Sequence, residues 1–204
     1  NIQSLPFIFR SSEDVYASMD GALGDFLRNE LRSKGIYLFP SGLMENGFRH
    51  IVTNNRPIFN AEDLEGLTIR IPEGEVFEDT FKAFGARPVQ LFVLELYESL
   101  KNGSLEAQEN PLAIIESLKL YEVTKYISKT SHMWSGFNMI ANAGFWNSLP
   151  QDIRRVVEKH VARQVMIQRK QTDDLNKQLE QSLVRRGMLI NRAERSEERR
   201  VGKE

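Results

Sequence analysis

The sequence predicts an α/β fold, because helical and strand-like segments alternate along most of the chain. A helical pattern over residues 12–33 precedes an apolar, strand-like run at 36–39, and strand-like segments at 67–71 and 88–92 flank a helical pattern at 76–84. Strands and helices that alternate at these lengths are typical of βαβ units and of a largely parallel sheet. A chain of 204 residues is long enough for one large domain or for two small lobes, each with its own core.

The first predicted helix covers residues 12–33, and Gly35 ends it. A short buried strand at 36–39 follows, and the turn-forming residues 40–42 are expected to close it. The apolar residues of the helix share one face, which comprises Val15, Met19, Leu23, Phe26, Leu27 and Leu31.

The middle of the chain begins a second unit near Phe48 and contains the clearest strand. Residues 67–71 alternate in the manner of a strand and stop at Pro72, which cannot continue a sheet ladder. A helix at 76–84 and another at 95–101 follow, the second ending at Asn102-Gly103. This order favours parallel pairing of the strands between the helices.

The last third of the chain changes character. Residues 138–142 are strand-like, and the helical spacing from Ile153 to Gly187 far exceeds the typical helix of about 11–12 residues. Its polar middle, residues 168–174, indicates a bend or a solvent-exposed bridging segment. A coiled coil is the alternative, but strict heptads are not sustained.

Composition excludes several classes of protein. The formal net charge is −1, so nothing favours nucleic-acid binding, and no stretch approaches the roughly 18–20 apolar residues of a membrane span. The chain has no Cys, which excludes disulfides, a thiol nucleophile and thiolate metal sites. Nucleophile-elbow, phosphate-loop and dinucleotide motifs are absent, and we expect neither an enzyme nor a cofactor. His50, His132 and His160 lack metal-ligand spacing and are predicted to be surface or structural histidines.

Arg70 is the first candidate binding residue. It lies at the end of the predicted strand 67–71, where ligands of parallel α/β sheets bind, and its guanidinium can hold a carboxylate through two parallel hydrogen bonds. Asn110 is the second candidate, because Pro111 restricts it to an extended conformation and so directs its amide. Spacing alone leaves a surface or ion-paired arginine and an Asx-turn loop open as alternatives.

The ordered motifs around Arg70 resemble those of TRAP-transporter substrate-binding proteins of the dicarboxylate-binding type. The resemblance extends over about residues 1–190. The matching segments are Gly66-Leu67-Thr68-Ile69-Arg70-Ile71-Pro72, Gly85-Ala86-Arg87-Pro88, Glu95-Leu96-Tyr97 with Leu100 and Gly103, Gln108-Glu109-Asn110-Pro111, Lys119-Leu120-Tyr121-Glu122-Val123, Ser131-His132, and Gly47-Phe48-Arg49.

This resemblance implies a two-lobed periplasmic-binding-protein fold of type II, whose lobes are joined by crossing strands and a long helix and close over an organic acid. We expect residues 1–47 to form part of lobe one, 48–134 lobe two, and 135–194 the return to lobe one with the bridging helix. We also expect the amino-terminal part of lobe one to be missing. Residues 195–204 are charged and apolar-poor, and we expect a non-native tail, with a genuine disordered tail as the alternative.

The resemblance also assigns ligand contacts. Arg70 is the family's strand arginine that binds the ligand carboxylate, and Asn110 and Arg49 are similar to further family contacts. Pro72 would shape the wall beside Arg70, and Trp134 is a further candidate.

One position departs from the family pattern. The family places an aromatic residue two positions before the Glu of its Glu-Leu-Tyr motif, where this chain has Val93. The aromatic Phe92 stands one position earlier and would face the other way on a regular strand. Which of the two lines the cleft stays open, and Phe92 is the candidate we carry forward.

The expected function is extracytoplasmic capture of a small carboxylate and its delivery to a TRAP-type membrane permease. Periplasmic localisation, a monomeric state and the permease partner follow from the resemblance alone. No signal segment precedes Leu5, which says nothing about localisation, because we expect the natural start to be missing. A ligand-sensing module of the same fold and a small-molecule enzyme stay open as alternatives.

Overall fold

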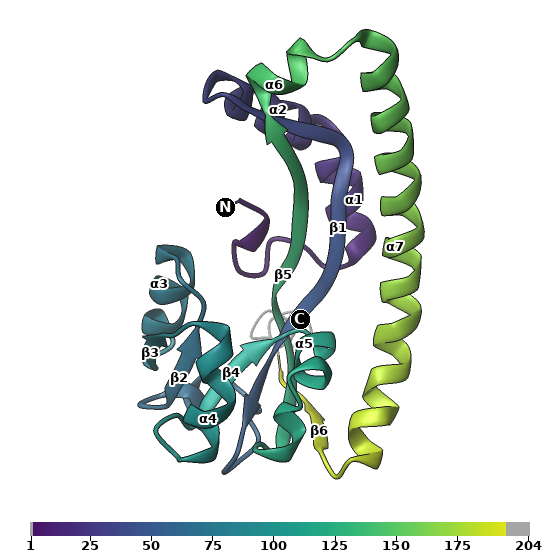
Figure 1. Ribbon diagram of the computed structural model, residues 1–204. Coiled ribbons are helices and arrows are strands. Elements are labelled where there is room, and N and C mark those ends of the chain that lie inside the picture. Colours follow the sequence, from purple (N-terminus) through teal and green to yellow (C-terminus); the bar gives the residue numbers. More distant parts are fainter. Residues whose placement is uncertain (1, 195–204) are drawn as a thin grey trace, which may run out of the picture. The chain divides into compact units, whose positions relative to one another are not determined.

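A six-stranded mixed sheet organises residues 2–194, which the computed structural model describes (Figure 1). Its strand order is β3-β2-β4-β1-β5-β6. The predicted tail, residues 195–204, lies outside the described residues. The strands are β1 (Ile36–Thr53), β2 (Thr68–Ile71), β3 (Arg87–Gln90), β4 (Ala107–Asn110), β5 (Tyr126–Asn142) and β6 (Leu189–Arg192).

Helices alternate with these strands along the chain, which confirms the predicted α/β class. Short 3-10 turns lie at η1 (Ile2–Ser4), η2 (Glu62–Leu64), η3 (Val93–Glu95) and η4 (Leu120–Glu122). The α-helices are α1 (Ser12–Met19), α2 (Ala22–Ser33), α3 (Glu75–Ala83), α4 (Leu96–Lys101), α5 (Leu112–Ser117), α6 (Ala143–Ser148) and α7 (Gln151–Arg185).

The sheet is mixed rather than parallel throughout. Strand β2 runs parallel to β3 and β4, and β5 runs parallel to β6, as the alternation of strands and helices predicts. Strands β1 and β4 are antiparallel, with His50 opposite Asn110 and Val52 opposite Gln108. This pairing places the second half of β1 beside the strand that carries Asn110.

The described chain divides into two compact units. Unit 1 contains residues 2–7, Phe48–Trp134 and 176–194, and unit 2 contains Ile8–Gly47 and Ser135–Leu175. The sequence-based division grouped residues 1–47 with 135–194, whereas residues 2–7 and 176–194 cluster with Phe48–Trp134. The later segment does so because β6 pairs with β5 and because α7 contributes its last turns to a unit 1 core.

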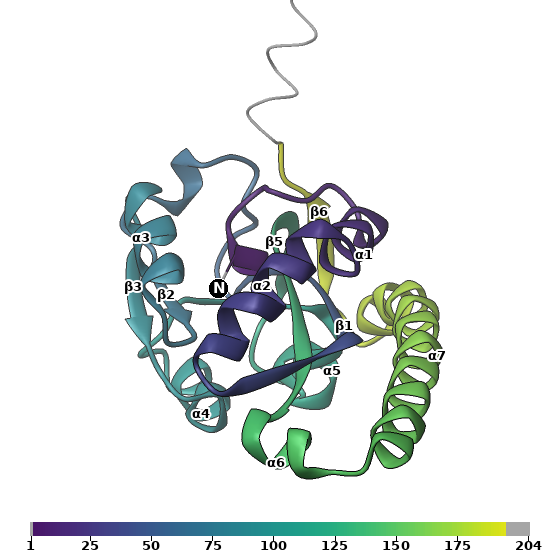
Figure 2. The same cartoon turned by 90° about the horizontal axis from the view of Figure 1, so that it is seen from above.

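In unit 1, alternate side chains of the strands enter two separate cores. Figure 2 labels the helices α3, α4 and α5, which contribute to these cores. Ile69 and Ile71 of β2 face α3, where Phe81 is fully buried. Val52 of β1 faces the opposite core. That second core also holds Leu96 and Leu100 of α4, Leu112 and Ile115 of α5, and Leu179 and Leu183 of α7.

Unit 2 builds a smaller aromatic core from the first half of β1 and from α6. Tyr37 stacks on Trp146 with ring centroids 4.7 Å apart, and Phe39 meets the same indole edge-on at 4.8 Å. Val157 and Val161 of α7 pack against this cluster. Such aromatic pairs add to the stabilisation that burial alone provides.

The predicted helix over residues 12–33 is interrupted in unit 2. The chain breaks between α1 and α2 around Gly21. A Cβ at Gly24 would lie 1.7 Å from the carbonyl oxygen of Met19, so only glycine permits this close approach. The break also leaves Phe26 59% exposed rather than on a common buried face.

The predicted turn at 40–42 does not end its strand, because β1 continues for 18 residues. Ser41 adopts a positive φ of 52°, and a Cβ at Gly42 would lie 2.7 Å from that of Phe39. The chain therefore bends tightly here within the strand. Leu43 returns to the interior immediately afterwards.

The polar middle of α7 is neither a bend that ends the helix nor wholly solvent-exposed. The helix is continuous over 35 residues. Arg169 is buried and donates to the carbonyl oxygen of Leu43 at 2.8 Å and to both carboxylate oxygens of Asp20, at 2.6 and 3.0 Å. Polar side chains thus attach α7 to β1 within unit 2.

Candidate functional site

Arg70 occupies the third position of β2, and its side chain is buried in unit 1. Nε and Nη2 donate to the carbonyl oxygen of Leu91 at 2.8 and 2.7 Å, which fixes the plane of the guanidinium. Among the described residues, no carboxylate forms an ion pair with Arg70. Burial lowers the pKa of Arg70, a change that the charge of Glu109 opposes and that of Arg49 reinforces.

Arg49, a second predicted contact, has a carboxylate partner inside unit 1. Nη2 of Arg49 lies 2.6 Å from Oε1 of Glu109, and Nε donates to Oε2 of the same carboxylate. Nη2 also donates to the backbone oxygen of Glu109 at 2.8 Å. Both side chains are buried, and the ring of Phe77 lies 5.4 Å from the Arg49 guanidinium carbon.

His132 completes the surroundings of Glu109. Its Nε2 lies 3.2 Å from Oε2 of Glu109, and its Nδ1 lies 2.8 Å from the hydroxyl of Thr130. Burial disfavours the ionised form of Glu109, but the charge of Arg49 and the hydrogen bonds from His132 and Arg49 hold the pKa of Glu109 below its ordinary value. Glu109 is therefore an anion inside the protein.

The charges of this cluster do not cancel. Glu109 neutralises Arg49, and the positive charge of Arg70 remains. Buried charges are normally paired, because desolvation of an isolated ion is costly. The cluster is thus electrostatically suited to one additional anion beside Arg70.

A series of hydrogen bonds runs along β4 from Arg49 through Asn110 to Gln108. Nη2 of Arg49 donates to Oδ1 of Asn110 at 3.2 Å, and Nδ2 of Asn110 donates to Oε1 of Gln108 at 2.5 Å. In the parallel pairing of β2 with β4, Arg70 stands opposite Gln108. Paired residues project from the same face of a sheet, so the amide of Gln108 and the guanidinium of Arg70 are neighbours.

The remaining predicted contacts differ in exposure. Pro72 follows β2 directly and is half-buried, while Trp134 is only 1% exposed. Phe92 is 66% exposed and Val93 is half-buried. Because β3 ends at Gln90 and η3 begins at Val93, the alternation of a regular strand does not decide between them. The contacts of all four residues with a ligand stay predictions.

Sequence reasoning missed two residues of this cluster, Glu109 and Gln108, as partners of the predicted arginine and asparagine. Both stand in the segment Gln108–Pro111 that singled out Asn110, but only the pairing of β4 with β1 and β2 brings them to Arg49 and Arg70. The predicted structural role of His132 is observed, since both ring nitrogens have partners.

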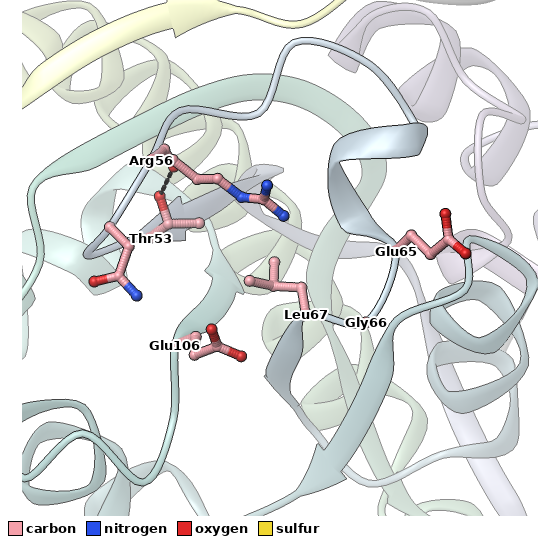
Figure 3. Close-up of a pocket in the computed structure, with 7 residues that line it drawn as sticks. Thr53, Arg56, Glu65, Gly66, Leu67 and Glu106 are labelled. Carbon is pink, nitrogen blue, oxygen red and sulfur yellow. Dashed lines mark hydrogen bonds between the residues drawn. The ribbon is translucent and has the colours of Figure 1, made fainter.

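A separate pocket of about 190 Å³ lies at the opposite end of β2. Figure 3 shows side chains around it from the end of β1, from the turn before β2 and from the start of β4. It is smaller than the roughly 300–1,000 Å³ of ordinary ligand pockets. Arg56 donates there to the backbone oxygen of Asp63 at 3.0 Å, and Glu106 accepts from the backbone of Thr68 at 2.9 Å. Both polar side chains, Arg56 and Glu106, thus bond to the backbone and have a structural role in this pocket.

Residues 2–194 contain neither a candidate metal centre nor a helix that could cross a membrane. Within that part of the chain, His, Cys, Asp and Glu form no group arranged to hold a metal ion. No helix of the described chain combines the length and the apolar character of a membrane span. The Arg70 cluster is therefore the strongest candidate for ligand binding.

Comparison with known proteins shows the family to which the chain belongs. The family described as bacterial extracellular solute-binding protein, family 7, matches residues 1–203. The chain belongs to this family. Members of this solute-binding family include proteins whose names describe periplasmic binding of carboxylates.

Two curated family 7 relatives illustrate the range of acids. The C4-dicarboxylate-binding periplasmic protein DctP of Rhodobacter capsulatus is 34% identical over 160 residues, which are 78% of this chain and 46% of the relative. The 2,3-diketo-L-gulonate-binding periplasmic protein YiaO of Escherichia coli is 31% identical over 157 residues, or 77% of this chain and 47% of the relative. The chain thus spans about half the length of these relatives.

A solved structure supports the family 7 fold. The TRAP periplasmic solute-binding protein of Polaromonas sp. JS666, bound to D-erythronate, is 32% identical and superposes with a TM-score of 0.88. The alignment covers 97% of this chain and 64% of that structure. The recognition of a TRAP-type solute-binding protein from the sequence is confirmed.

Proposed function

We propose that this protein captures a small organic acid at Arg70 and delivers it to a TRAP-type membrane permease. The observation that carries the proposal is the buried guanidinium of Arg70, which lacks a carboxylate partner among the described residues while its neighbour Arg49 has one. A carboxylate ligand would supply the missing negative charge.

The geometry favours a carboxylate over a neutral ligand. The bonds from Nε and Nη2 to Leu91 hold the guanidinium plane and leave Nη1 available for an acceptor. A charge-assisted hydrogen bond in a water-poor site is stronger than a neutral one. Arg70 thus provides both the charge and the direction for binding.

Relatives support the class of ligand without fixing its identity. The proteins compared above are named for, or were solved with, a C4-dicarboxylate, a diketo-gulonate and D-erythronate. All three ligands are small organic acids. We propose the same class for this chain, with selectivity set by residues around the acid group rather than by Arg70 itself.

The proposal also places the protein outside the cytoplasm, as a monomer that acts by binding and not by catalysis. It rests on family membership and on a site whose acidic member, Glu109, is held by Arg49 and His132. A carboxylate held in this way is poorly suited to proton transfer. A sensing module of the same fold is the second candidate, and binding assays on the permease would distinguish it.

The decisive experiment measures affinity for succinate, D-erythronate and 2,3-diketo-L-gulonate by calorimetry on the intact protein and on its Arg70→Ala variant. We expect at least one acid to bind and Arg70→Ala to weaken it by about 30-fold or more, because loss of one partner of a desolvated charge pair costs about 2–5 kcal/mol. Arg87→Ala is the matched control, since this exposed arginine holds the carbonyl of Gly66 through the same two nitrogens. Equal affinity of the Arg70→Ala variant would refute the proposed site.

A further inference from the structure

We propose that Gln108 is a further ligand-binding residue of the Arg70 site, which donates a hydrogen bond from Nε2 to the carboxylate group of the ligand. The inference rests on the proposed function and adds a second recognition group to it. It concerns a residue that neither the motifs nor the predicted contacts assigned to the ligand.

The side-chain amide of Gln108 is buried and half satisfied. The residue is 0% exposed, and its Oε1 accepts from Asn110 at 2.5 Å. Its Nε2 is buried without an acceptor among the described residues. Buried polar groups nearly always have a hydrogen-bond partner, so an orphaned amide donor calls for an explanation.

The direction of this amide follows from Arg49. A guanidinium only donates, so the atom of Asn110 that faces Nη2 of Arg49 at 3.2 Å must be its oxygen. Nδ2 of Asn110 then points at Oε1 of Gln108, and Nε2 of Gln108 is the free end of the chain of bonds. Because Arg49 is itself fixed by Glu109, only an acceptor can satisfy this end.

The neighbouring strands offer no such acceptor from their side chains. Gln108 stands between Arg70 of β2 and Val52 of β1 in the register of the sheet. Arg70 only donates, and Val52 is apolar. An acid bound to Arg70 would bring an acceptor oxygen to this position, beside both donors.

The test compares Gln108→Met, which keeps the length of the side chain but has no donor, with Gln108→Glu, which replaces the donor by a negative charge. Calorimetry uses the intact protein with succinate, D-erythronate and 2,3-diketo-L-gulonate. We expect Gln108→Met to weaken binding about tenfold or more, the loss of one hydrogen bond to a charged group, and Gln108→Glu to abolish it. Gln90→Met is the control, because Gln90 is exposed and bonds to Glu78.

Melting with and without ligand separates recognition from structural support. Gln108→Met removes the unsatisfied donor but also the acceptor of Asn110, so its melting temperature without ligand reports only on structural support. Recognition also predicts a smaller rise of the melting temperature when an acid is added, whereas a purely structural role predicts the same rise as in the wild type. Affinity within twofold of the wild type in Gln108→Met, while Arg70→Ala loses binding, would overturn the role of Gln108 and leave the proposed function standing. Unchanged binding in Arg70→Ala, or no binding of any acid by the wild type, would overturn both.

Discussion

Arg49 and Glu109 form a buried ion pair in which Nη2 and Oε1 are 2.6 Å apart, although 60 positions separate the two residues in the sequence. The pair neutralises one of two adjacent arginines and so leaves Arg70 as the cluster's available cation. It also orients Asn110, whose oxygen accepts from Arg49. The pair therefore leaves the site with one uncompensated positive charge and orients the amides of Asn110 and Gln108. Neither effect requires Arg49 to contact the ligand.

Removal of the acid from this pair should destabilise unit 1. In Glu109→Gln, the guanidinium of Arg49 stays buried without a counter-charge, and we expect a loss of about 3–5 kcal/mol in the free energy of unfolding. Urea denaturation measures this loss. Glu78→Gln is the control: its exposed pair with Lys82 should contribute little to stability. A loss in Glu109→Gln no larger than in the control would show that Arg49 is compensated elsewhere.

His50 should make stability depend on pH. Burial, followed by the charges of His132 and Lys129, lowers the pKa of His50 to about 3 from an ordinary 6.5. The unfolded chain therefore binds a proton below pH 6.5 that folded His50 accepts only near pH 3. The stability that neutral His50 contributes is complete above pH 6.5 and is lost as pH falls through this window.

The measurement compares the free energy of unfolding at pH 7.5 and 5.5 in wild type and His50→Gln. The wild type should lose about 1 kcal/mol more than the variant over this interval, because each pH unit contributes at most about 1.4 kcal/mol per proton. His160→Gln is the control, since His160 is exposed on α7. Identical pH dependence in wild type and His50→Gln would contradict the prediction that buried His50 causes the loss of stability.

The strand of Arg70 could be predicted from sequence because its signals are local. The alternation over 67–71 and the stop at Pro72 do not depend on distant contacts. The partners of Arg70 could not be predicted in the same way. The register that places Gln108 beside Arg70, and the pairing that brings Glu109 to Arg49, are non-local properties of the sheet.

Two elements were mispredicted because a local signal was outweighed by packing. Pro40 and Gly42 indicated a turn, but β1 bends there and continues. The polar middle of α7 indicated exposure, whereas Arg169 turns inward to Asp20 and Leu43. A polar residue on a helix can thus be an interior anchor when a partner exists on another element, which composition does not reveal.

The last turns of α7 should stabilise unit 1. Leu183 is fully buried in the core that also contains Leu179 and Val52, so Leu183→Ala should cost about 2–5 kcal/mol. Val184→Ala, at the exposed neighbouring position, should change stability by less than about 1 kcal/mol. Fluorescence of Trp134 in a Trp146→Phe background reports on unit 1 during urea unfolding. Equal effects of the two substitutions would show that α7 does not complete this core.

Arg169 should act as the corresponding anchor in unit 2. Its guanidinium bonds both oxygens of Asp20, donates to the carbonyl of Leu43 and lies 4.1 Å from the ring centroid of Tyr16. A lysine keeps the charge but can reproduce neither the planar fork nor the stacking. We therefore expect Arg169→Lys to lower the free energy of unfolding by about 1–3 kcal/mol.

Trp146 lies in the aromatic core of unit 2. Its fluorescence during urea unfolding, in a Trp134→Phe background, therefore measures the effect of Arg169→Lys on the stability of unit 2. Arg155→Lys on the same helix is the control, because Arg155 is exposed and should tolerate the change within about 0.5 kcal/mol. If charge alone mattered, Arg169→Lys would match this control. A larger loss in Arg169→Lys, together with a similar loss in Asp20→Asn, would show that the two-pronged contact with Asp20 attaches the middle of α7 to unit 2.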